Sequence, residues 1–308
     1  MNMNLANGAW PTMVTPFDHN QGIDYGALGA LTDWYIANGA DGLFAACQSS
    51  EIFYLSLEER AKLSKFVKEK SSGRVPVVAS GHVSYDLHDQ AEELNRIAET
   101  GVDAVILISN RLAGEDENDD VFLERLDSLL HELPKDVRLG FYECPYPYKR
   151  VLTPKILKYC VSTGRFAFLK DTCCDIGQIR EKLSILNGSG MRLFNANTAT
   201  LVESMKYGGA GYSGVMANFQ MKLYAWLVKH WKENQRVTDM VQNVLTMCSY
   251  IELKNYPANA KCYLNMVGVP MGETARKGSQ AAQTATERLE LSQMAQLTRV
   301  METKLGIS

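Results

Sequence analysis

Long apolar runs and an excess of positive charge are both missing from the sequence. No apolar run reaches the roughly 18–20 residues that a helix needs to cross a bilayer. The start, MNMNLANGAWPTMVTPF, lacks the basic residues and apolar core of a signal peptide. The formal net charge is −3, so no basic field favours nucleic acid or an anionic membrane. We therefore expect a cytoplasmic protein that binds neither membranes nor nucleic acid.

Motifs for metals and common cofactors are also missing. The seven cysteines are odd in number and scattered, without a CxxC, which is typical of free thiols in a reducing compartment. The adjacent pair Cys173-Cys174 and the five histidines lack the spacing of a zinc site. No GxSxG or phosphate-binding loop occurs, and no GxGxxG follows the first predicted strand. We therefore expect no metal and no bound cofactor.

Short apolar segments alternate with helical patterns through residue 218. Short apolar runs are typical of strands that are buried on both faces of a parallel sheet. The eight expected strands are residues 10–17, 42–47, 75–80, 104–109, 138–143, 166–170, 192–196 and 211–215. The helical patterns between them cover residues 25–37, 57–68, 87–99, 121–133, 154–161, 176–186 and 198–207.

Capping signals support these helix positions. Ser56 and Glu59 have the spacing of a capping box, and Thr153-Pro154 places proline at the first helical position. Strands and helices that alternate every roughly 25–30 residues predict an α/β fold, a (β/α)₈ TIM barrel over residues 1–218. The main alternative is a doubly wound sheet, which the absence of GxGxxG after the first strand disfavours.

No strand pattern follows residue 218. Residues 222–232, 237–253, 258–267 and 279–304 have helical patterns. They predict a C-terminal helical domain over residues 219–308. No Gly-, Ser- or Pro-rich linker precedes it, so we expect it to pack on the barrel.

Two residues at predicted strand ends have the chemistry of a carbonyl-attacking site. Active sites of such barrels lie where the carboxyl ends of the strands meet. Lys170 ends FAFLK, where burial disfavours its charged form and leaves a nucleophilic amine. Tyr142, in GFYECP on the neighbouring strand, is placed to move protons. The alternatives are a surface lysine paired with Asp171 and an aromatic plug at the barrel mouth.

Polar and small residues follow other strands. Gln48, Ser49 and Ser50 lie in CQSSE, where a turn offers hydroxyls and N–H groups to a carboxylate or caps a helix. After the seventh strand stand Asn195, Asn197 and Thr198, and the eighth contains Ser213. These are candidate substrate-binding residues, and a purely structural role stays open for each.

The order of several longer motifs indicates a family. These motifs are PTMVTPF, CQSSE with LSLEER, VPVVASG, GVDAVIL, YECP, KDTCCD, GGAGYSGVMANF and NYPANAKCYLNMVGVP. In this order they resemble the dihydrodipicolinate synthase and N-acetylneuraminate lyase superfamily of class I, pyruvate-type aldolases and lyases. The resemblance implies a barrel with a C-terminal helical domain and a homotetramer built as a dimer of dimers.

The resemblance also implies roles for individual residues. Lys170 is implied as the Schiff-base lysine and Tyr142 as the proton relay. Ser49 and its neighbours would bind the carboxylate of a 2-oxo acid. Residues around Ser213 would line the Schiff-base pocket, and those around Asn197 would face the variable part of the substrate.

The chain departs from the family pattern in the loop after the second strand. The family loop is usually Gly-Thr-Thr-Gly-Glu, whereas this chain has Cys47-Gln48-Ser49-Ser50-Glu51. An amide at Gln48 replaces a hydroxyl, so the hydroxyl relay at this position is lost. Ser50 replaces a glycine, so the turn must accept a residue with a Cβ.

Two markers of the lysine-pathway synthase are absent. That synthase has a Tyr-Tyr pair after the fourth strand, where this chain has residues 110–112, Asn-Arg-Leu. It also has an arginine for a second carboxylate, where this chain has Pro147, followed closely by Lys149 and Arg150. We therefore expect a family member that is not a true dihydrodipicolinate synthase.

The predicted function is a lyase or aldolase that forms a Schiff base between Lys170 and a 2-oxo acid and interconverts it with pyruvate plus an aldehyde. The resulting iminium accepts electrons better than a ketone does. One alternative is a dehydratase of a 2-oxo-3-deoxy sugar acid that uses the same imine. The other is a non-catalytic protein that binds a 2-oxo acid.

Overall fold

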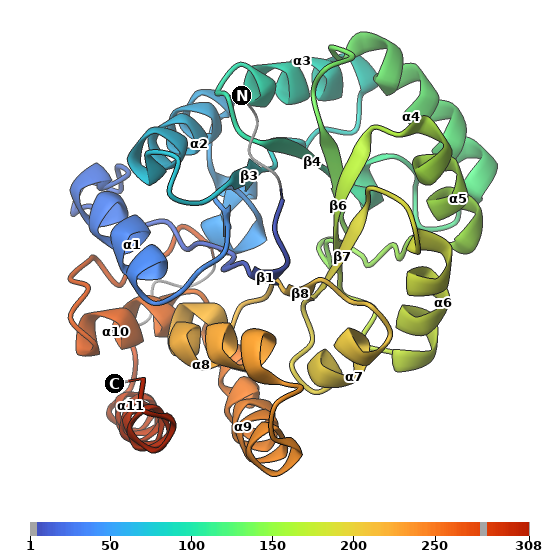
Figure 1. Ribbon diagram of the computed structural model, residues 1–308. Coiled ribbons are helices and arrows are strands. Elements are labelled where there is room, and N and C mark those ends of the chain that lie inside the picture. Colours follow the sequence, from blue (N-terminus) through green and yellow to red (C-terminus); the bar gives the residue numbers. More distant parts are fainter. Residues whose placement is uncertain (1–4, 278–281, 308) are drawn as a thin grey trace.

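Eight parallel strands form the centre of the molecule (Figure 1). The computed structural model describes residues 5–277 and 282–307. The strands run in the order β1-β8-β7-β6-β5-β4-β3-β2. Their bounds are β1 (Gly8–Ala9), β2 (Leu43–Phe44), β3 (Val77–Ala79), β4 (Ala104–Ile108), β5 (Leu139–Tyr142), β6 (Phe166–Asp171), β7 (Arg192–Asn195) and β8 (Gly211–Tyr212).

Closure of the ring depends on a short first strand. β1 pairs with β8, and Thr12 then forms an isolated bridge to Phe44 of β2. The sequence predicted one strand over residues 10–17, which is wrong in extent. Pro11 has no N–H for a ladder, and the chain turns there from β8 toward β2.

One helix follows each strand and lies outside the barrel (Figure 1). Both capping signals read from the sequence are confirmed, the Ser56–Glu59 box and Thr153 before Pro154. The helices are α1 (Tyr25–Ala37), α2 (Leu57–Ser71), α3 (Leu87–Ala98), α4 (Asp119–Glu132), α5 (Pro154–Thr163), α6 (Ile176–Leu186), α7 (Leu201–Lys206) and α8 (Ala217–His230). The (β/α)₈ fold expected from the sequence is confirmed.

Aromatic rings fill the barrel beneath the strand ends. Trp10 contacts Phe168 and Phe194 with ring centroids 5.4 and 5.3 Å apart, and the two phenylalanines stack at 4.6 Å. Because alternate residues of a strand share a face, Phe168 lies one layer below Lys170. The rings give Lys170 an apolar floor.

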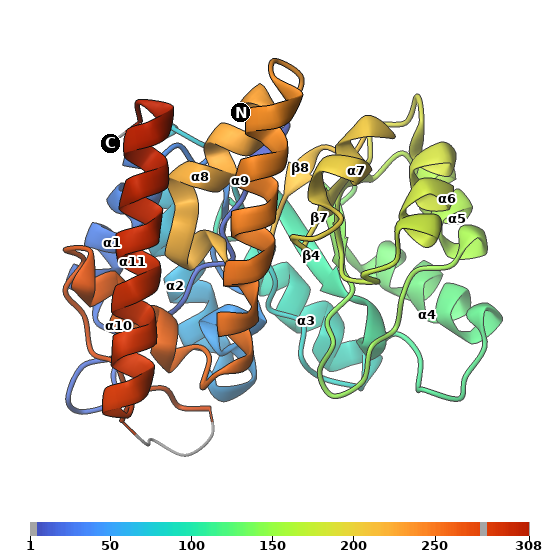
Figure 2. The ribbon, with the colours of Figure 1, turned by 90° about the horizontal axis from the view of Figure 1, so that it is seen from below.

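Three further helices follow α8 along one side of the barrel (Figure 2). They are α9 (Gln235–Cys248), α10 (Ala258–Met266) and α11 (Ala285–Leu305), and a 3₁₀ turn, η4 (Ser249–Leu253), joins α9 to α10. α8 packs against β1, while α10 and α11 pack on each other and on α8. The expected helix over residues 279–304 starts only at Ala285, and its residues 279–281 lie outside the described chain. The division of the chain after residue 218 stays a prediction.

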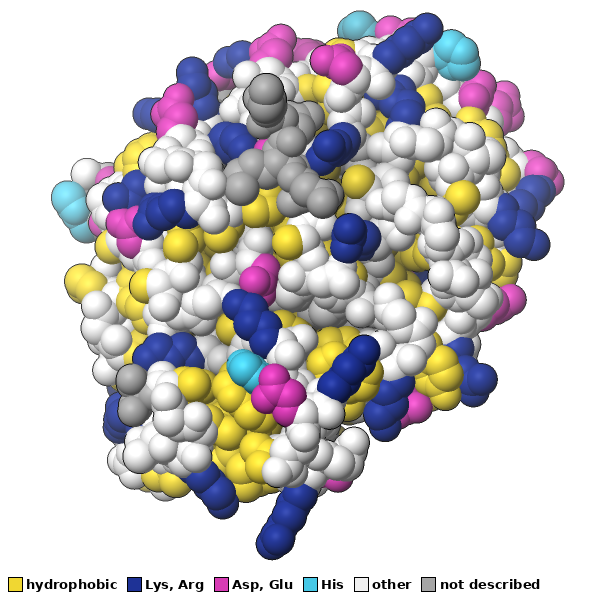
Figure 3. All heavy atoms as spheres, viewed as in Figure 1, with side chains coloured by type: hydrophobic (Ala, Val, Ile, Leu, Met, Phe, Trp, Pro, Cys, Tyr) yellow, Lys and Arg dark blue, Asp and Glu magenta, His cyan; other side chains and the backbone are white. Residues whose placement is uncertain are grey.

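Charges of both signs are interspersed around the rim of the face in Figure 3. Apolar side chains gather in the lower part of this view, over the region of the C-terminal helices (Figure 3). In the described residues, no helix is both long enough and apolar enough to cross a membrane.

Candidate active site

Lys170 and Tyr142 lie side by side at the carboxyl ends of β6 and β5. The two residues are register partners in the parallel pair, and each side chain is buried. The Lys170 Nζ lies 4.1 Å from the centroid of the Tyr142 ring. Asp171, the alternative partner of Lys170, pairs with Lys182 instead. Adjacency of these two side chains is what the parallel register predicts.

The environment of Lys170 favours its neutral form. Burial lowers the pKa of Lys170, and the nearby Cys47, Cys144 and Glu252 oppose that shift. A lysine amine must be neutral to attack a carbonyl carbon. The position therefore suits a nucleophilic amine better than a permanently charged one.

The Tyr142 hydroxyl donates a hydrogen bond to the Gln48 Oε1, at 3.0 Å. Burial raises the pKa of Tyr142 well above its usual value, with a smaller contribution from Cys144. The phenol is therefore protonated at neutral pH, and its proton points to an amide oxygen. The hydrogen bond from the Tyr142 hydroxyl therefore ends at the Gln48 amide oxygen.

The loop after β2 divides into a structural and a pocket-facing half. Ser50 is buried, and its Oγ lies 2.7 Å from the carbonyl oxygens of both Met13 and Ala45. The Ser49 Oγ instead donates to the Thr12 Oγ1, at 3.1 Å. Ser50 therefore holds the loop to the first and second strands, and Ser49 remains beside the pocket.

The family pattern has a glycine at position 50 of this loop. The backbone conformation that favours glycine lies one residue later, at Glu51. Glu51 has φ 63°, in the left-handed region, whereas Ser50 has no positive φ. The Glu51 carboxylate accepts from the Lys261 Nζ at 2.9 Å, and both side chains are fully buried. The ion pair ties the loop to α10 and holds the unusual backbone in place.

A pocket of about 240 Å³ opens at these strand ends. It brings together five of the candidate residues, Gln48, Ser49, Tyr142, Lys170 and Asn197. The remaining lining residues are Pro145, Lys149, Thr172, Cys174, Ala196, Val215, Glu252, Tyr256, Pro257 and Lys277.

Three other candidate residues lie outside the lining of this pocket, as does Asn195. Ser50 holds its loop, as described above, and the Thr198 Oγ1 shares a hydrogen bond of 2.7 Å with the Tyr224 hydroxyl. Ser213 is buried and its Oγ has no hydrogen-bond partner in the described structure, while its backbone N–H donates to Asn195. Asn195 itself donates to Thr200 and shapes the turn after β7.

The C-terminal segment supplies a pocket wall that the strand pattern did not indicate. Glu252, Tyr256 and Pro257 come from η4 and the turn before α10. Burial raises the pKa of Tyr256, which lies within hydrogen-bonding reach of Ser49. Tyr256 and Pro257 belong to the family motif NYPANAKCYLNMVGVP, but nothing in its pattern showed that this segment returns to the strand ends.

A buried ion network supports the strand ends from the outer side. Lys182 of α6 pairs with Glu143 and Asp171, which directly follow Tyr142 and Lys170. Burial and the neighbouring Asp171 charge raise the pKa of Glu143 to about 7, against the opposite effect of Lys182. Because strand side chains alternate, these acids point away from the pocket and fix the strands that carry Lys170 and Tyr142.

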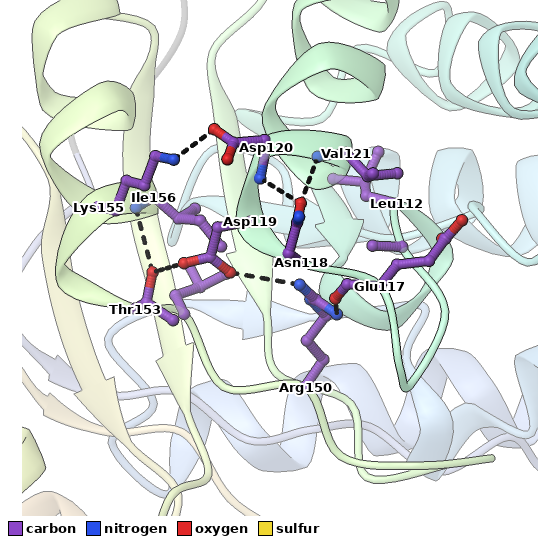
Figure 4. A network of polar contacts seen from close by, with 12 residues as sticks. Leu112, Glu117, Asn118, Asp119, Asp120, Val121, Arg150, Thr153, Lys155 and Ile156 are labelled. Carbon is purple, nitrogen blue, oxygen red and sulfur yellow. Dashed lines mark hydrogen bonds and ion pairs between the residues drawn. The ribbon is translucent and has the colours of Figure 1, made fainter.

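The two basic residues after Pro147 have different surroundings. The Lys149 Nζ lines the pocket and donates to the Thr172 carbonyl at 2.8 Å. Arg150 instead donates to Gly114 and Glu117 carbonyls and pairs with Asp119, at the start of α4 (Figure 4). Arg150 is therefore committed to the fold, and Lys149 provides positive charge at the pocket.

No three His, Cys, Asp or Glu side chains form a metal-binding group within residues 5–277 and 282–307. The chemistry assembled in the pocket is that of an amine, a phenol, an amide, a hydroxyl and a carboxyl.

Sequence comparisons identify the family of the chain. The model of the dihydrodipicolinate synthetase family matches residues 5–297. A 4-hydroxy-tetrahydrodipicolinate synthase from Clostridium tetani is 25% identical over 275 residues, covering 88% of this chain and 91% of the relative. One from Bacillus subtilis is 25% identical over 296 residues, covering 94% and 98%.

Solved structures share the whole architecture. YagE, a prophage protein of the dihydrodipicolinic acid synthase family from E. coli K12 solved with pyruvate, has a TM-score of 0.84 at 19% identity, covering 95% of this chain and 98% of its own. Dihydrodipicolinate synthase from Thermotoga maritima has a TM-score of 0.85 at 17% identity, covering 96% and 99%. The fold and the family match over nearly the whole length therefore agree: the chain belongs to the dihydrodipicolinate synthetase family.

Proposed function

We propose that the protein is a lyase or aldolase that forms a Schiff base between Lys170 and a 2-oxo acid. One observation carries the proposal: a buried lysine amine lies 4.1 Å from a tyrosine ring at adjacent ends of two barrel strands. Membership of the dihydrodipicolinate synthetase family supports a pyruvate-dependent aldolase or lyase. The pyruvate complex of the structurally similar YagE supports the same class of ligand.

The reaction begins with attack of the neutral Lys170 amine on the keto carbon. Tyr142 lies beside the nitrogen and donates a proton as the keto oxygen leaves as water. The iminium that remains draws electrons from the C3–C4 bond. This bond breaks as the C4 hydroxyl loses its proton, which releases an aldehyde and leaves a pyruvyl enamine on Lys170. Protonation at C3 and hydrolysis by water then free pyruvate and the Lys170 amine. The Ser49 hydroxyl and the Gln48 amide provide hydrogen bonds to the substrate carboxylate.

The aldehyde half faces Asn197, Lys149 and Lys277 at the pocket edge. Their amide and ammonium groups favour a polar or anionic chain there over an apolar one. With 24–25% identity to many of the named synthases, and with Pro147 in place of their arginine, the chain fits a different second substrate.

Reduction of the imine tests this proposal. The protein is incubated with pyruvate and sodium borohydride, and mass spectrometry of the digest locates the adduct. We expect one reduced pyruvyl group on Lys170 and none in Lys170→Arg. Lys149→Met is the matched control, since it removes another lysine of the same pocket and should leave the adduct intact. An unmodified Lys170 with pyruvate and with related 2-oxo acids would leave non-catalytic binding as the better description.

Dehydration of a 2-oxo-3-deoxy sugar acid is the second candidate, because the same iminium also promotes loss of a β-hydroxyl as water. Candidate acids are incubated with the protein, and released pyruvate is measured by a coupled reduction to lactate. Pyruvate release supports the aldolase. Consumption of the acid without pyruvate supports the dehydratase.

The assembly is a further part of the proposal. We propose that the protein is a cytoplasmic homotetramer, built as a dimer of dimers. Light scattering after gel filtration measures the mass of the assembly and tests its oligomeric state. A structural relative with a TM-score of 0.85 and 17% identity is a monomeric variant of dihydrodipicolinate synthase, so a monomer is the contrary result.

A further inference from the structure

Cys174 is a pocket residue that the proposed reaction does not use. It lies in the loop between β6 and α6, and it belongs to the lining of the pocket that contains Lys170. Cys47 and Cys144, the thiols that interact with Lys170, are buried, whereas Cys174 is exposed. The Cys174 side chain can therefore contact a bound molecule directly.

The backbone of Cys174 has a conformation that favours glycine. Its φ is 59°, in the left-handed region, where a Cβ crowds the following carbonyl oxygen. Glycine at this position would remove the crowding. A residue held in such a conformation beside a pocket indicates that its side chain has a role there.

Two polar contacts hold the Cys174 sulfur at the pocket wall. Its thiol donates to the Thr172 carbonyl oxygen at 3.4 Å, and the same oxygen accepts from the Lys149 Nζ at 2.8 Å. The Asn197 side chain lies within hydrogen-bonding reach of the sulfur. The Asn197 Oδ1 accepts from the N–H and the hydroxyl of Thr200, so the Asn197 amide N–H groups remain for the sulfur and for a ligand.

The strand order places Cys174 opposite the loop that would hold the substrate carboxylate. In the closed ring, β3, β4 and β5 separate β2 from β6 on one side, and β1, β8 and β7 separate them on the other. Gln48 and Ser49 follow β2, whereas Cys174 follows β6. A 2-oxo acid with its carboxylate at the β2 loop and its keto carbon on Lys170 therefore extends beyond C3 toward the loops after β6 and β7.

We propose that Cys174 is a specificity-determining residue whose side chain limits the length of the substrate beyond C3, an inference that rests on the proposed imine at Lys170. No bond forms to the sulfur. The Cβ and Sγ occupy the space into which a longer chain would extend. The Asn197 amide and the Lys149 ammonium group beside them bind the polar end of a short one. The pocket therefore selects a short polar aldehyde as the second product or substrate.

A series of 2-oxo acids of increasing length tests this role without an aldehyde. Pyruvate, 2-oxobutanoate, 2-oxopentanoate and 2-oxohexanoate are each trapped on Lys170 of the full-length protein with sodium cyanoborohydride. Mass spectrometry gives the concentration of each acid for half-maximal trapping. The ratio of this concentration for 2-oxohexanoate to that for pyruvate measures selection by length. We expect Cys174→Gly to lower this ratio about tenfold or more, since one methylene in a fitted pocket changes selection by roughly 10–200-fold.

Three further variants separate the side chain from the backbone and from folding. Cys174→Ser has a side chain of nearly the same size and should keep the ratio close to that of the wild type. Ser72 has a φ of 49° at the end of α2 and lies outside the pocket lining, so Ser72→Gly makes a similar backbone change and should keep the wild-type ratio. Cys174→Leu lengthens the side chain in the pocket and should raise the ratio, which tests the role of Cys174 independently of the glycine variant.

The outcomes distinguish this inference from the proposed function. Trapping of pyruvate with a wild-type ratio in Cys174→Gly would overturn the role of Cys174 and leave the imine at Lys170 standing. An equal fall of the ratio in Cys174→Ser would also overturn it, since the size of the side chain would then not be the requirement. A ratio in Cys174→Leu at or below that of the wild type would overturn it as well. Absence of trapping with every acid in the wild-type protein would overturn both proposals.

Discussion

Replacement of Lys182 by methionine tests the buried ion network beside the ends of β5 and β6. Lys182 is 3% exposed and pairs with two fully buried carboxylates, those of Glu143 and Asp171. Removing one partner of a buried ion pair costs about 3–5 kcal/mol, because the remaining charge stays desolvated. We expect the free energy of unfolding of Lys182→Met to fall by this amount, measured by urea denaturation with circular dichroism.

The pH dependence of this penalty gives a second measure. The pKa of Glu143 is about 7 in the folded protein, above its ordinary value of 4.5. A raised folded pKa contributes stability that is full below the unfolded value and is lost as the pH rises through the folded one. Without Lys182 the folded pKa rises further, so the penalty should stay constant between about pH 5 and about pH 7 and should grow from about pH 7 to about pH 8, where only the wild-type Glu143 ionises in the folded state.

A surface ion pair provides the control. Lys206 is 44% exposed and pairs with Glu203 three residues earlier on α7. Its replacement by methionine should change the free energy of unfolding by less than about 1 kcal/mol, at any pH in this range. Lys182→Met would refute the role of the network in supporting the strand ends if its free energy of unfolding fell no more than that of the control. A fall that does not vary with pH would refute it as well.

Three further predictions concern the site and its frame. Because burial lowers the pKa of Lys170, the rate of imine formation with pyruvate should reach half its maximum below pH 10.5; a midpoint at or above that value would contradict the neutral amine. Gly211→Ala should prevent stable folding or lower the free energy of unfolding by more than about 3 kcal/mol. The new Cβ would lie 2.0 Å from the Gly8 carbonyl oxygen, and Gly211 has a φ of +139°. An unchanged urea midpoint would argue against closure of the barrel at this pair. Lys261→Met should cost about 3–5 kcal/mol and raise the pyruvate concentration for half-maximal trapping, since it leaves Glu51 buried without its partner; unaltered pyruvate affinity would show that this pair does not position the loop.

The sequence predicted the barrel and the adjacency of Lys170 and Tyr142 because both depend on local patterns. Apolar runs of strand length mark segments that are buried on both faces, and parallel pairing aligns their carboxyl ends. Lys170 and Tyr142 each end such a run, so their contact follows once the strands are placed in order. The first strand was misplaced because an apolar run through Pro11 does not show where the ladder is interrupted.

Other parts of the site depend on how side chains turn and how distant segments meet. A serine in a turn binds a ligand or holds the backbone, and the pattern CQSSE does not distinguish Ser49, which lines the pocket, from Ser50, which holds the strands. Glu252 lines the same pocket as Lys170 only because the connection between α9 and α10 folds back over the barrel. No hydrophobic periodicity within residues 249–257 predicts that this connection folds back over the barrel.

The origin of the pocket wall has a consequence for how the protein can change over evolution or by design. The amine and the phenol lie on strands whose replacement would disturb the barrel, whereas Glu252, Tyr256 and Pro257 lie in the short connection between α9 and α10. Loops tolerate exchange better than the scaffold that holds them. Residues 249–257 can therefore be exchanged between relatives, which would change this wall of the pocket while the strands that carry Lys170 and Tyr142 stay in place.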